Sequence, residues 1–224
     1  MRVPRVPHQW KISPERAVAI QAALATRVSK EWDKRPVRWV AGLDAAFSGS
    51  TCIAGVVLWD SRERKIAEEH VAWRTLTFPY IPGLLSFREA PALIAALRKL
   101  RRPPDLLICD GQGIAHPRRF GIASHVGVLT GLPSIGCAKS RLIGNAVEPG
   151  KQRGSTSPLI DRGEEIGAVL RTKTGSKPVY VSVGHMIDLK SAVEIVLALA
   201  SGHRLPEPTR LADKLVALAK RDKM

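Results

Sequence analysis

The sequence contains little cysteine and no long apolar run. Its three cysteines, Cys52, Cys109 and Cys137, lie in short apolar runs, and none belongs to a Cys-x-x-Cys pair. This usage argues against a disulfide scaffold or a zinc site and predicts buried, reduced thiols, as in cytoplasmic proteins. The longest apolar stretches, such as residues 191–200, fall far short of the roughly 20 residues that a membrane span needs. The proline-interrupted first ten residues lack the apolar core of a secretory signal, so we expect a cytoplasmic protein without a membrane partner.

Acidic residues are scarce relative to basic ones. The chain has 35 Lys and Arg against 20 Asp and Glu, a formal net charge of +15. Such an excess favours a polyanionic partner, most often nucleic acid, although a merely solubilising surface is the alternative. The 45% of hydrophobic residues exclude collagen, a coiled coil and wholesale disorder. For 224 residues we expect a single domain, 1–224, with residues 1–11 as an N-terminal extension to which the pattern assigns no role.

The order of the predicted elements indicates a mixed α/β sheet. Three closely spaced strands, 37–47, 51–60 and 65–77, predict an antiparallel meander. The buried strand 106–109, a helix over 120–129 and the strand 134–138 predict a parallel pair with a right-handed crossover. Further strands are expected at 165–171 and 179–183, helices at 14–31, 86–100 and from Asp188 and Pro208, and a mobile loop or excursion at 145–163. This layout, a sheet flanked by α-helices, suits a ribonuclease-H-like fold.

Four acidic residues stand where an acid is unusual. Asp44 lies within the first strand, and Asp110 ends the buried strand 106–109. Glu89 and Asp213 lie in predicted helices. Carboxylates at the ends of adjacent strands repel each other unless a cation joins them, and Mg²⁺ or Mn²⁺ suits oxygen ligands. The alternatives are a turn-capping role for Asp110 and a solvated helix face for Glu89.

The segment after the buried strand carries further polar groups. Gly111 and Gly113 allow a ligand to approach the backbone closely, although neither a dinucleotide fingerprint nor a P-loop follows. His116 is expected in a loop near the acids, or in a simple packing role. Lys139 follows the strand 134–138 and, if this strand is parallel to 106–109, lies at the same sheet edge as Asp110. There it would orient a water or stabilise charge, unless it is only a surface lysine.

A stiff, apolar turn precedes the predicted helix 86–100. Pro79, Tyr80, Ile81, Pro82 and Gly83 follow one another, so two prolines hold Tyr and Ile at the tip. Such a turn is able to enter a base stack and unstack it. The alternative is an ordinary connection whose aromatic ring packs on the core.

Five segments together resemble the endonuclease V family, which acts on deaminated adenine. They are Gly42-Leu43-Asp44, Pro79 to Gly83 with Phe87-Arg88-Glu89, Asp110 to Arg118, Gly136 to Ser140, and Arg204 to Arg210. The resemblance covers about residues 12–215, and the joint occurrence of these segments is specific. It implies a ribonuclease-H-like fold and a Mg²⁺-dependent phosphodiesterase, with Mn²⁺ also supporting activity.

The resemblance also assigns roles to single residues. The family's metal-binding acids correspond to Asp44, Glu89 and Asp110, its catalytic lysine to Lys139 and its active-site histidine to His116. The strand-separating wedge corresponds to Pro79, Tyr80, Ile81 and Pro82. Candidates for the lesion pocket are Gly83, Leu85, Gly111, Gly113, Ile122 and Leu142. Asp213 stands where some members of the family carry His. Asp is a competent Mg²⁺ ligand, so this difference bears on which metal the site prefers and not on whether the protein is active.

The implied reaction is cleavage of the second phosphodiester bond on the 3′ side of a deoxyinosine, leaving a 3′-hydroxyl and a 5′-phosphate. Inosine-containing RNA is a further expected substrate, and a monomer is the expected state. One rival is another ribonuclease-H-like nuclease, such as a junction resolvase or an RNA-strand hydrolase. The other is a non-catalytic, basic nucleic-acid-binding protein, which would need no group of carboxylates.

Overall fold

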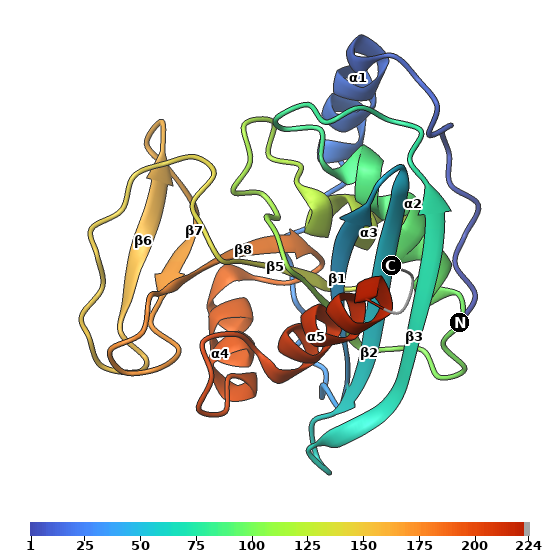
Figure 1. The fold of residues 1–224 in the computed structure, drawn as a ribbon. Helices are drawn as coiled ribbons and strands as arrows, with labels where there is room; N and C mark the ends of the chain where they lie inside the picture. Colours follow the sequence, from blue (N-terminus) through green and yellow to red (C-terminus); the bar gives the residue numbers. More distant parts are fainter. Residues whose placement is uncertain (222–224) are drawn as a thin grey trace.

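The computed structural model describes residues 1–221 and contains one eight-stranded mixed sheet (Figure 1). The last three residues of the predicted domain 1–224 lie outside the described part. The strand order is β3-β2-β1-β4-β5-β8-β7-β6. In chain order the elements are α1 (Pro14–Ala25), β1 (Trp39–Ser48), β2 (Thr51–Asp60), β3 (Lys65–Thr75), α2 (Ser86–Leu97), β4 (Leu106–Cys109), α3 (Ile122–Thr130), β5 (Ser134–Ala138), β6 (Thr156–Asp161), β7 (Glu164–Leu170), β8 (Val179–His185), α4 (Leu189–Leu199) and α5 (Glu207–Arg221).

The predicted fold is confirmed by the strand pairing. β1, β2 and β3 form an antiparallel meander, and β4 and β5 run parallel to β1. All four residues of β4 are buried, because helices cover both faces of the sheet at its centre. The central parallel strands β1, β4 and β5 therefore direct their carboxyl ends to one edge, where ligands bind in open α/β sheets.

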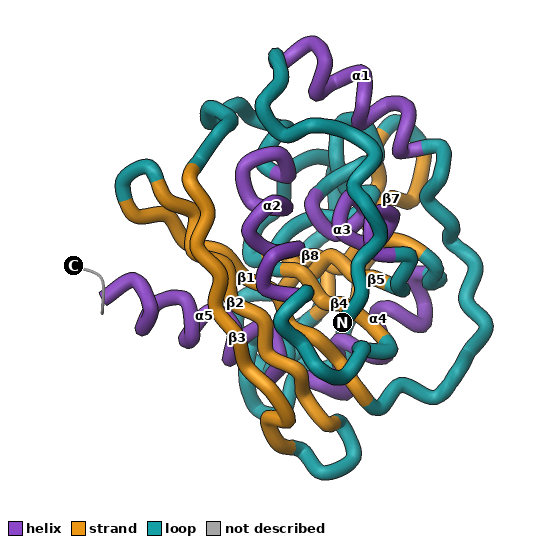
Figure 2. Tube along the Cα trace, turned by 90° about the vertical axis from the view of Figure 1, so that its right-hand side faces the viewer, coloured by secondary structure: helices purple, strands orange, loops and turns teal. Residues whose placement is uncertain are grey.

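Helices form a layer on each face of the sheet. α2 and α3 lie on one face, with α1 beyond them, and α4 and α5 lie on the other (Figures 1 and 2). Residues alternate between the two cores along β1: Ala41 and Leu43 join the core under α2 and α3, and Val40 joins the core under α4. At Gly42 a Cβ atom would lie 2.1 Å from the carbonyl of Pro208, so this glycine allows the start of α5 to reach the sheet.

Two sequence predictions need correction. The stretch 145–163 is not a loop throughout, because β6 occupies its second half and pairs with β7 around a turn at Arg162 and Gly163, both of positive φ. Pro158 is tolerated there because β6 is an edge strand. The first helix ends at Ala25 rather than residue 31, since tertiary bonds extend the chain beyond it: Ser29 N–H donates to His185 Nδ1, and the Ser29 carbonyl accepts from Met186 N–H.

The N-terminal segment 1–11 packs on the helices rather than standing free. Val3 is buried in the core under α2, and Val6 and Trp10 pack against it. The segment runs along the outer side of α2 and α3 before entering α1 (Figure 2). All three cysteines are buried and free, as predicted. Within residues 1–221 no helix has the length and apolarity needed to cross a membrane.

Candidate active site

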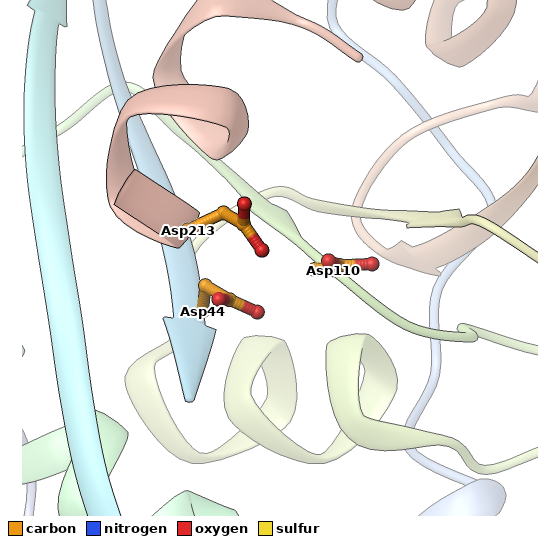
Figure 3. Close-up of side chains that lie close together, drawn as sticks. All are labelled: Asp44, Asp110 and Asp213. Atoms are coloured by element: carbon orange, nitrogen blue, oxygen red, sulfur yellow. The ribbon is translucent and has the colours of Figure 1, made fainter. Parts of the chain in front are cut away.

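Three aspartates from three elements converge at the carboxyl edge of the central strands (Figure 3). Asp44 lies in β1 on the face toward α5, and Asp110 follows β4 directly. The Asp110 N–H donates to the Leu43 carbonyl at 3.0 Å, which fixes the two acids side by side. Asp213 reaches the same point from α5. One carboxylate oxygen from each residue lies within 4.8 Å of the others.

Lys139 partly neutralises this group of acids. Its Nζ lies 2.6 Å from Asp110 Oδ2 and 2.9 Å from Asp213 Oδ1. Partial burial opposes its charge, but the hydrogen bonds and charges of these two carboxylates prevail and raise the pKa of Lys139. Burial raises the pKa of Asp44 to about 7, with Asp110 as the next cause. Lys139 is thus paired with Asp110 and Asp213, and burial disfavours the charged form of Asp44 beside them.

These three carboxylates fit a divalent cation. Hard cations such as Mg²⁺ and Mn²⁺ take oxygen ligands, and a doubly charged ion would favour the ionised form of Asp44, which burial and the neighbouring Asp110 disfavour. Glu89 lies outside this close group. It is buried in the first turn of α2, and burial, followed by the charges of Asp44 and Asp110, raises its pKa to about 8.

A cavity of about 380 Å³ adjoins the acids and shares Asp110 and Lys139 with them. Its volume lies in the range of small-ligand sites. The cavity is lined by most residues of the predicted wedge and pocket, which are Tyr80, Ile81, Pro82, Gly83, Leu85, Gly111, Ile122 and Leu142. The predicted active-site histidine, His116, lines it as well. Tyr80 is 71% exposed, whereas Ile122 is buried.

Two predicted residues of the wedge and pocket do not line this cavity. Pro79 is exposed beside it. Gly113 lies behind it, where its N–H donates to Ser182 Oγ at 2.8 Å and a Cβ atom would lie 2.0 Å from the Val183 carbonyl. The constraint on Gly113 is therefore close packing against β8.

The Gly83 carbonyl is a point where several side chains meet. It accepts hydrogen bonds from His116 Nε2 at 3.0 Å, Arg118 Nη2 at 2.6 Å and Gln21 Nε2 at 3.0 Å. The other ring nitrogen of His116 accepts from the Arg118 N–H at 3.2 Å. Gly83 has φ of +77°, so a side chain here would be strained and would press on Arg118. These contacts fix the turn that follows the wedge.

Comparisons with known proteins agree with this geometry. A family model described as endonuclease V matches residues 22–214. The endonuclease V of Roseiflexus sp. (strain RS-1) is 51% identical over 208 residues, which make up 93% of this chain and 94% of the relative. The chain belongs to the endonuclease V family. As a member it is a metal-dependent endonuclease, and the three aspartates form its candidate metal site.

Solved structures of endonuclease V have the same fold. That of Streptomyces avermitilis is 44% identical, with a TM-score of 0.92 over 99% of both chains. That of Ciona intestinalis is 27% identical, with a TM-score of 0.84 over 94% of this chain and 98% of its own. The Ciona protein is in complex with a 24mer DNA containing an inosine followed by a ribo-adenosine.

Three polar residues of this endonuclease V site escaped the sequence prediction. Gln21, Ser86 and Gln112 are nearly buried and line the cavity. Gln21 lies among Ala17, Ile20 and Leu24 on the buried face of α1. A polar amide at an apolar position of a helix is the sequence feature that could have identified it. Ser86 begins α2 and has no such signal in the sequence.

Proposed function

We propose that this protein cleaves DNA at deoxyinosine, at the second phosphodiester bond on the 3′ side of the lesion. The observation that carries the proposal is the cavity beside the three aspartates: Asp110 belongs to both, and its ion-pair partner Lys139 also lines the cavity. A base held in the cavity would bring its own strand past the acids. The inosine-containing DNA bound by the Ciona relative supports the same substrate class.

The acids hold the metal in this proposal. Asp44, Asp110 and Asp213 bind it through oxygen, and Glu89 supports the site directly or through water from its buried position. Mg²⁺ is the proposed ion, with Mn²⁺ as a substitute, and when bound it polarises the scissile phosphate.

The chain's own residues direct the hydrolysis. Lys139 orients the attacking water and offsets charge in the transition state. The water oxygen forms a bond to phosphorus, the bond to the 3′ oxygen breaks, and a proton passes to that oxygen. The products are a 3′-hydroxyl and a 5′-phosphate. His116 acts through its bond to the Gly83 carbonyl, which keeps the pocket in shape.

Recognition requires the base to leave the stack. The exposed Tyr80, stiffened by Pro79 and Pro82, fills the gap with Ile81 beside it. Gly83 and Gly111 let the backbone approach the base, and Gly113 keeps the loop against β8. The apolar walls are Leu85, Ile122 and Leu142.

The proposal extends to inosine-containing RNA as a second substrate. Phosphate contacts hold either strand without reading its sequence, and the 2′-hydroxyl is the group of an RNA strand that the site has to accommodate. We also propose that the protein is a monomer, and the molar mass from light scattering of the free protein tests this directly.

The test is a cleavage assay with end-labelled duplexes. One carries a single deoxyinosine, one is undamaged, and a matched RNA carries inosine. Each is incubated with Mg²⁺, Mn²⁺ or EDTA. We expect a metal-dependent nick one nucleotide beyond the inosine's own 3′ phosphate, in DNA and in RNA. Equal cutting of undamaged duplex, or a preference for a four-way junction, would instead favour a structure-selective nuclease.

A further inference from the structure

A chain of hydrogen bonds runs from the N-terminal segment to the cavity wall. The Gln9 carbonyl lies 3.0 Å from His8 Nδ1, and His8 Nε2 lies 3.0 Å from His125 Nε2. His125 Nδ1 lies 2.9 Å from Ser86 Oγ. Ser86 lines the cavity at the start of α2, and His125 is fully buried in α3. Three separate parts of the chain are thereby joined behind the pocket.

The first member of the chain determines the direction of every bond. A carbonyl oxygen only accepts, so His8 Nδ1 carries the proton that is donated to Gln9. In a neutral His8 the other nitrogen, Nε2, is then an acceptor, and His125 donates to it from Nε2. This leaves His125 Nδ1 as an acceptor, so the Ser86 hydroxyl donates to it. The remaining lone pairs of Ser86 Oγ are free to accept.

The surroundings support the neutral form of both rings. Burial, followed by the nearby His8, lowers the pKa of His125 to about 3, and burial lowers the pKa of His8. Trp10 and Phe87 pack against both rings and hold their orientation. Within residues 1–221 the Ser86 hydroxyl has no other hydrogen-bond partner. The acceptor is therefore fixed in direction before any ligand enters.

We propose that Ser86 is a specificity-determining residue whose hydroxyl oxygen accepts a hydrogen bond from N1–H of a hypoxanthine base in the cavity. The inference rests on the proposed function. N1–H is the one N–H donor on the hypoxanthine ring when N9 bears the sugar, whereas adenine has an unprotonated N1 there. An acceptor that cannot become a donor therefore favours hypoxanthine and repels adenine at this atom.

His8 and His125 are positioning residues in this scheme. They touch no substrate, and they act by preventing the Ser86 hydroxyl from turning its proton into the cavity. The N-terminal segment thus contributes to base recognition through His125, although His8 itself does not line the cavity. If His125 carried its proton on Nδ1, it would donate to Ser86 Oγ instead. The Ser86 hydroxyl would then be free to donate its own proton into the cavity.

The test compares single-turnover cleavage of three duplexes. One contains deoxyinosine, one contains 1-deaza-2′-deoxyinosine, in which C–H stands at position 1 and the ring proton lies on N3 or O6, and one contains the 3-deaza analogue, which retains N1–H and lacks N3. For the wild-type protein, loss of N1–H should slow cleavage about tenfold, because the acceptor is left unpaired. In Ser86→Ala the deoxyinosine and 1-deaza duplexes should be cut at rates within about twofold of each other.

A second variant tests the relay away from the cavity. His8→Leu removes the acceptor for His125, so the tenfold ratio should fall to about threefold while the protein stays folded. Gln9→Ala is the matched control, since it changes an exposed neighbour and leaves the backbone carbonyl. It should keep the wild-type ratio.

The outcomes separate this inference from the function on which it rests. A tenfold ratio that persists in Ser86→Ala, or a wild-type protein indifferent to N1–H, overturns the role of Ser86 while cleavage at deoxyinosine stands. A wild-type protein that does not prefer deoxyinosine over undamaged duplex overturns both. Equal losses on all three duplexes in Ser86→Ala would show a purely structural role.

Discussion

His116 is a nearly buried histidine with both ring nitrogens occupied by backbone groups. Nε2 donates to the Gly83 carbonyl, and Nδ1 accepts from Arg118 N–H. Burial, followed by the charge of Arg118, lowers the pKa of His116 to about 4. The ring is therefore neutral when the protein is folded. Protonation of Nδ1 would break the hydrogen bond that it accepts from Arg118 N–H.

This neutrality makes one part of the stability depend on pH. The folded pKa of about 4 lies below the ordinary 6.5, so the unfolded chain binds a proton first as pH falls. The contribution of the neutral His116 to the free energy of unfolding is fully present above pH 6.5. It is lost as the pH falls from 6.5 to about 4, and the loss is on the order of 2–3 kcal/mol. His116→Gln keeps a donor for Gly83 and removes the titration. Its free energy of unfolding relative to wild type should rise as pH falls through this window, as measured by urea unfolding.

The exposed His203 supplies the control for that experiment. His203→Gln should show no comparable gain. A His116→Gln difference that is the same at pH 7 and pH 4.5 would contradict the buried, neutral state of this ring.

At the scale of single residues, the sequence singled out four acids by their unusual positions, and all but Glu89 lie in the close group of carboxylates. Asp44 in a strand and Asp110 at the end of a buried strand both lie in the close group of carboxylates. Ser86 was missed because a serine at a helix start is common and its partner His125 is 39 residues away. Such a pairing depends on helix packing, which periodicity does not encode.

At the scale of elements, the site depends on how closely α5 approaches the sheet. Asp213 faces Asp44 because Gly42 lets Pro208 lie against β1. Gly55 plays the same role on β2, where a Cβ atom would meet Val216. Two small residues on neighbouring strands thus set the distance between the helix and the sheet.

Gly42→Ala should separate α5 from β1. The new Cβ atom would lie 2.1 Å from the Pro208 carbonyl, so the helix has to move, at a cost of roughly 1–3 kcal/mol or more. Because Asp213 moves with α5, cleavage per folded molecule should fall at least tenfold. Thermal unfolding and single-turnover cleavage measure the two effects.

Gly131→Ala is the matched control at the end of α3. It strains a left-handed residue of φ +69° without any atom within 4 Å. Gly131 precedes the start of β5, whereas the acids lie at the opposite edge of the sheet, where β4 and β5 end. Stability should fall while cleavage per folded molecule stays unchanged. A Gly42→Ala protein with wild-type cleavage would show that the position of Asp213 does not matter.

Elements with strong local signals were predicted well, and those that depend on distant partners were not. The meander and the strands 106–109 and 134–138 follow from apolar runs bounded by turns, and all are present. β6 was missed because Pro158 and the serines in and before the strand, Ser155 and Ser157, favour a loop, whereas pairing with β7 decides its structure. The end of α1 was misplaced because the bonds of Ser29 to β8 are long-range.

At the scale of the whole molecule, the charge predicts how the protein meets its substrate. A net charge of +15 attracts any phosphate backbone, whatever its sequence or lesion. In the proposed function, recognition of the base instead depends on the cavity, whose walls combine apolar side chains with the Asp110–Lys139 ion pair. The two contributions should therefore respond differently to salt.

Raising the salt concentration from 50 to 200 mM should weaken binding of inosine-containing and undamaged duplexes by the same factor, roughly a hundredfold or more. The ratio of the two affinities should stay within about twofold, because the cavity contacts release few counterions. Fluorescence anisotropy with Ca²⁺ in place of Mg²⁺ measures both. A ratio that collapses with salt would place recognition in charged contacts.

The most direct test of the whole account is single-turnover cleavage of a deoxyinosine duplex by Asp44→Asn, with binding measured on the same protein. The change preserves the size of the side chain and removes one charge from the close group. We expect binding within about threefold of wild type and cleavage reduced by roughly a thousandfold, since the proposed metal loses a ligand. Cleavage by Asp44→Asn at the wild-type rate would contradict the assignment of these aspartates to the metal and of the metal to the reaction.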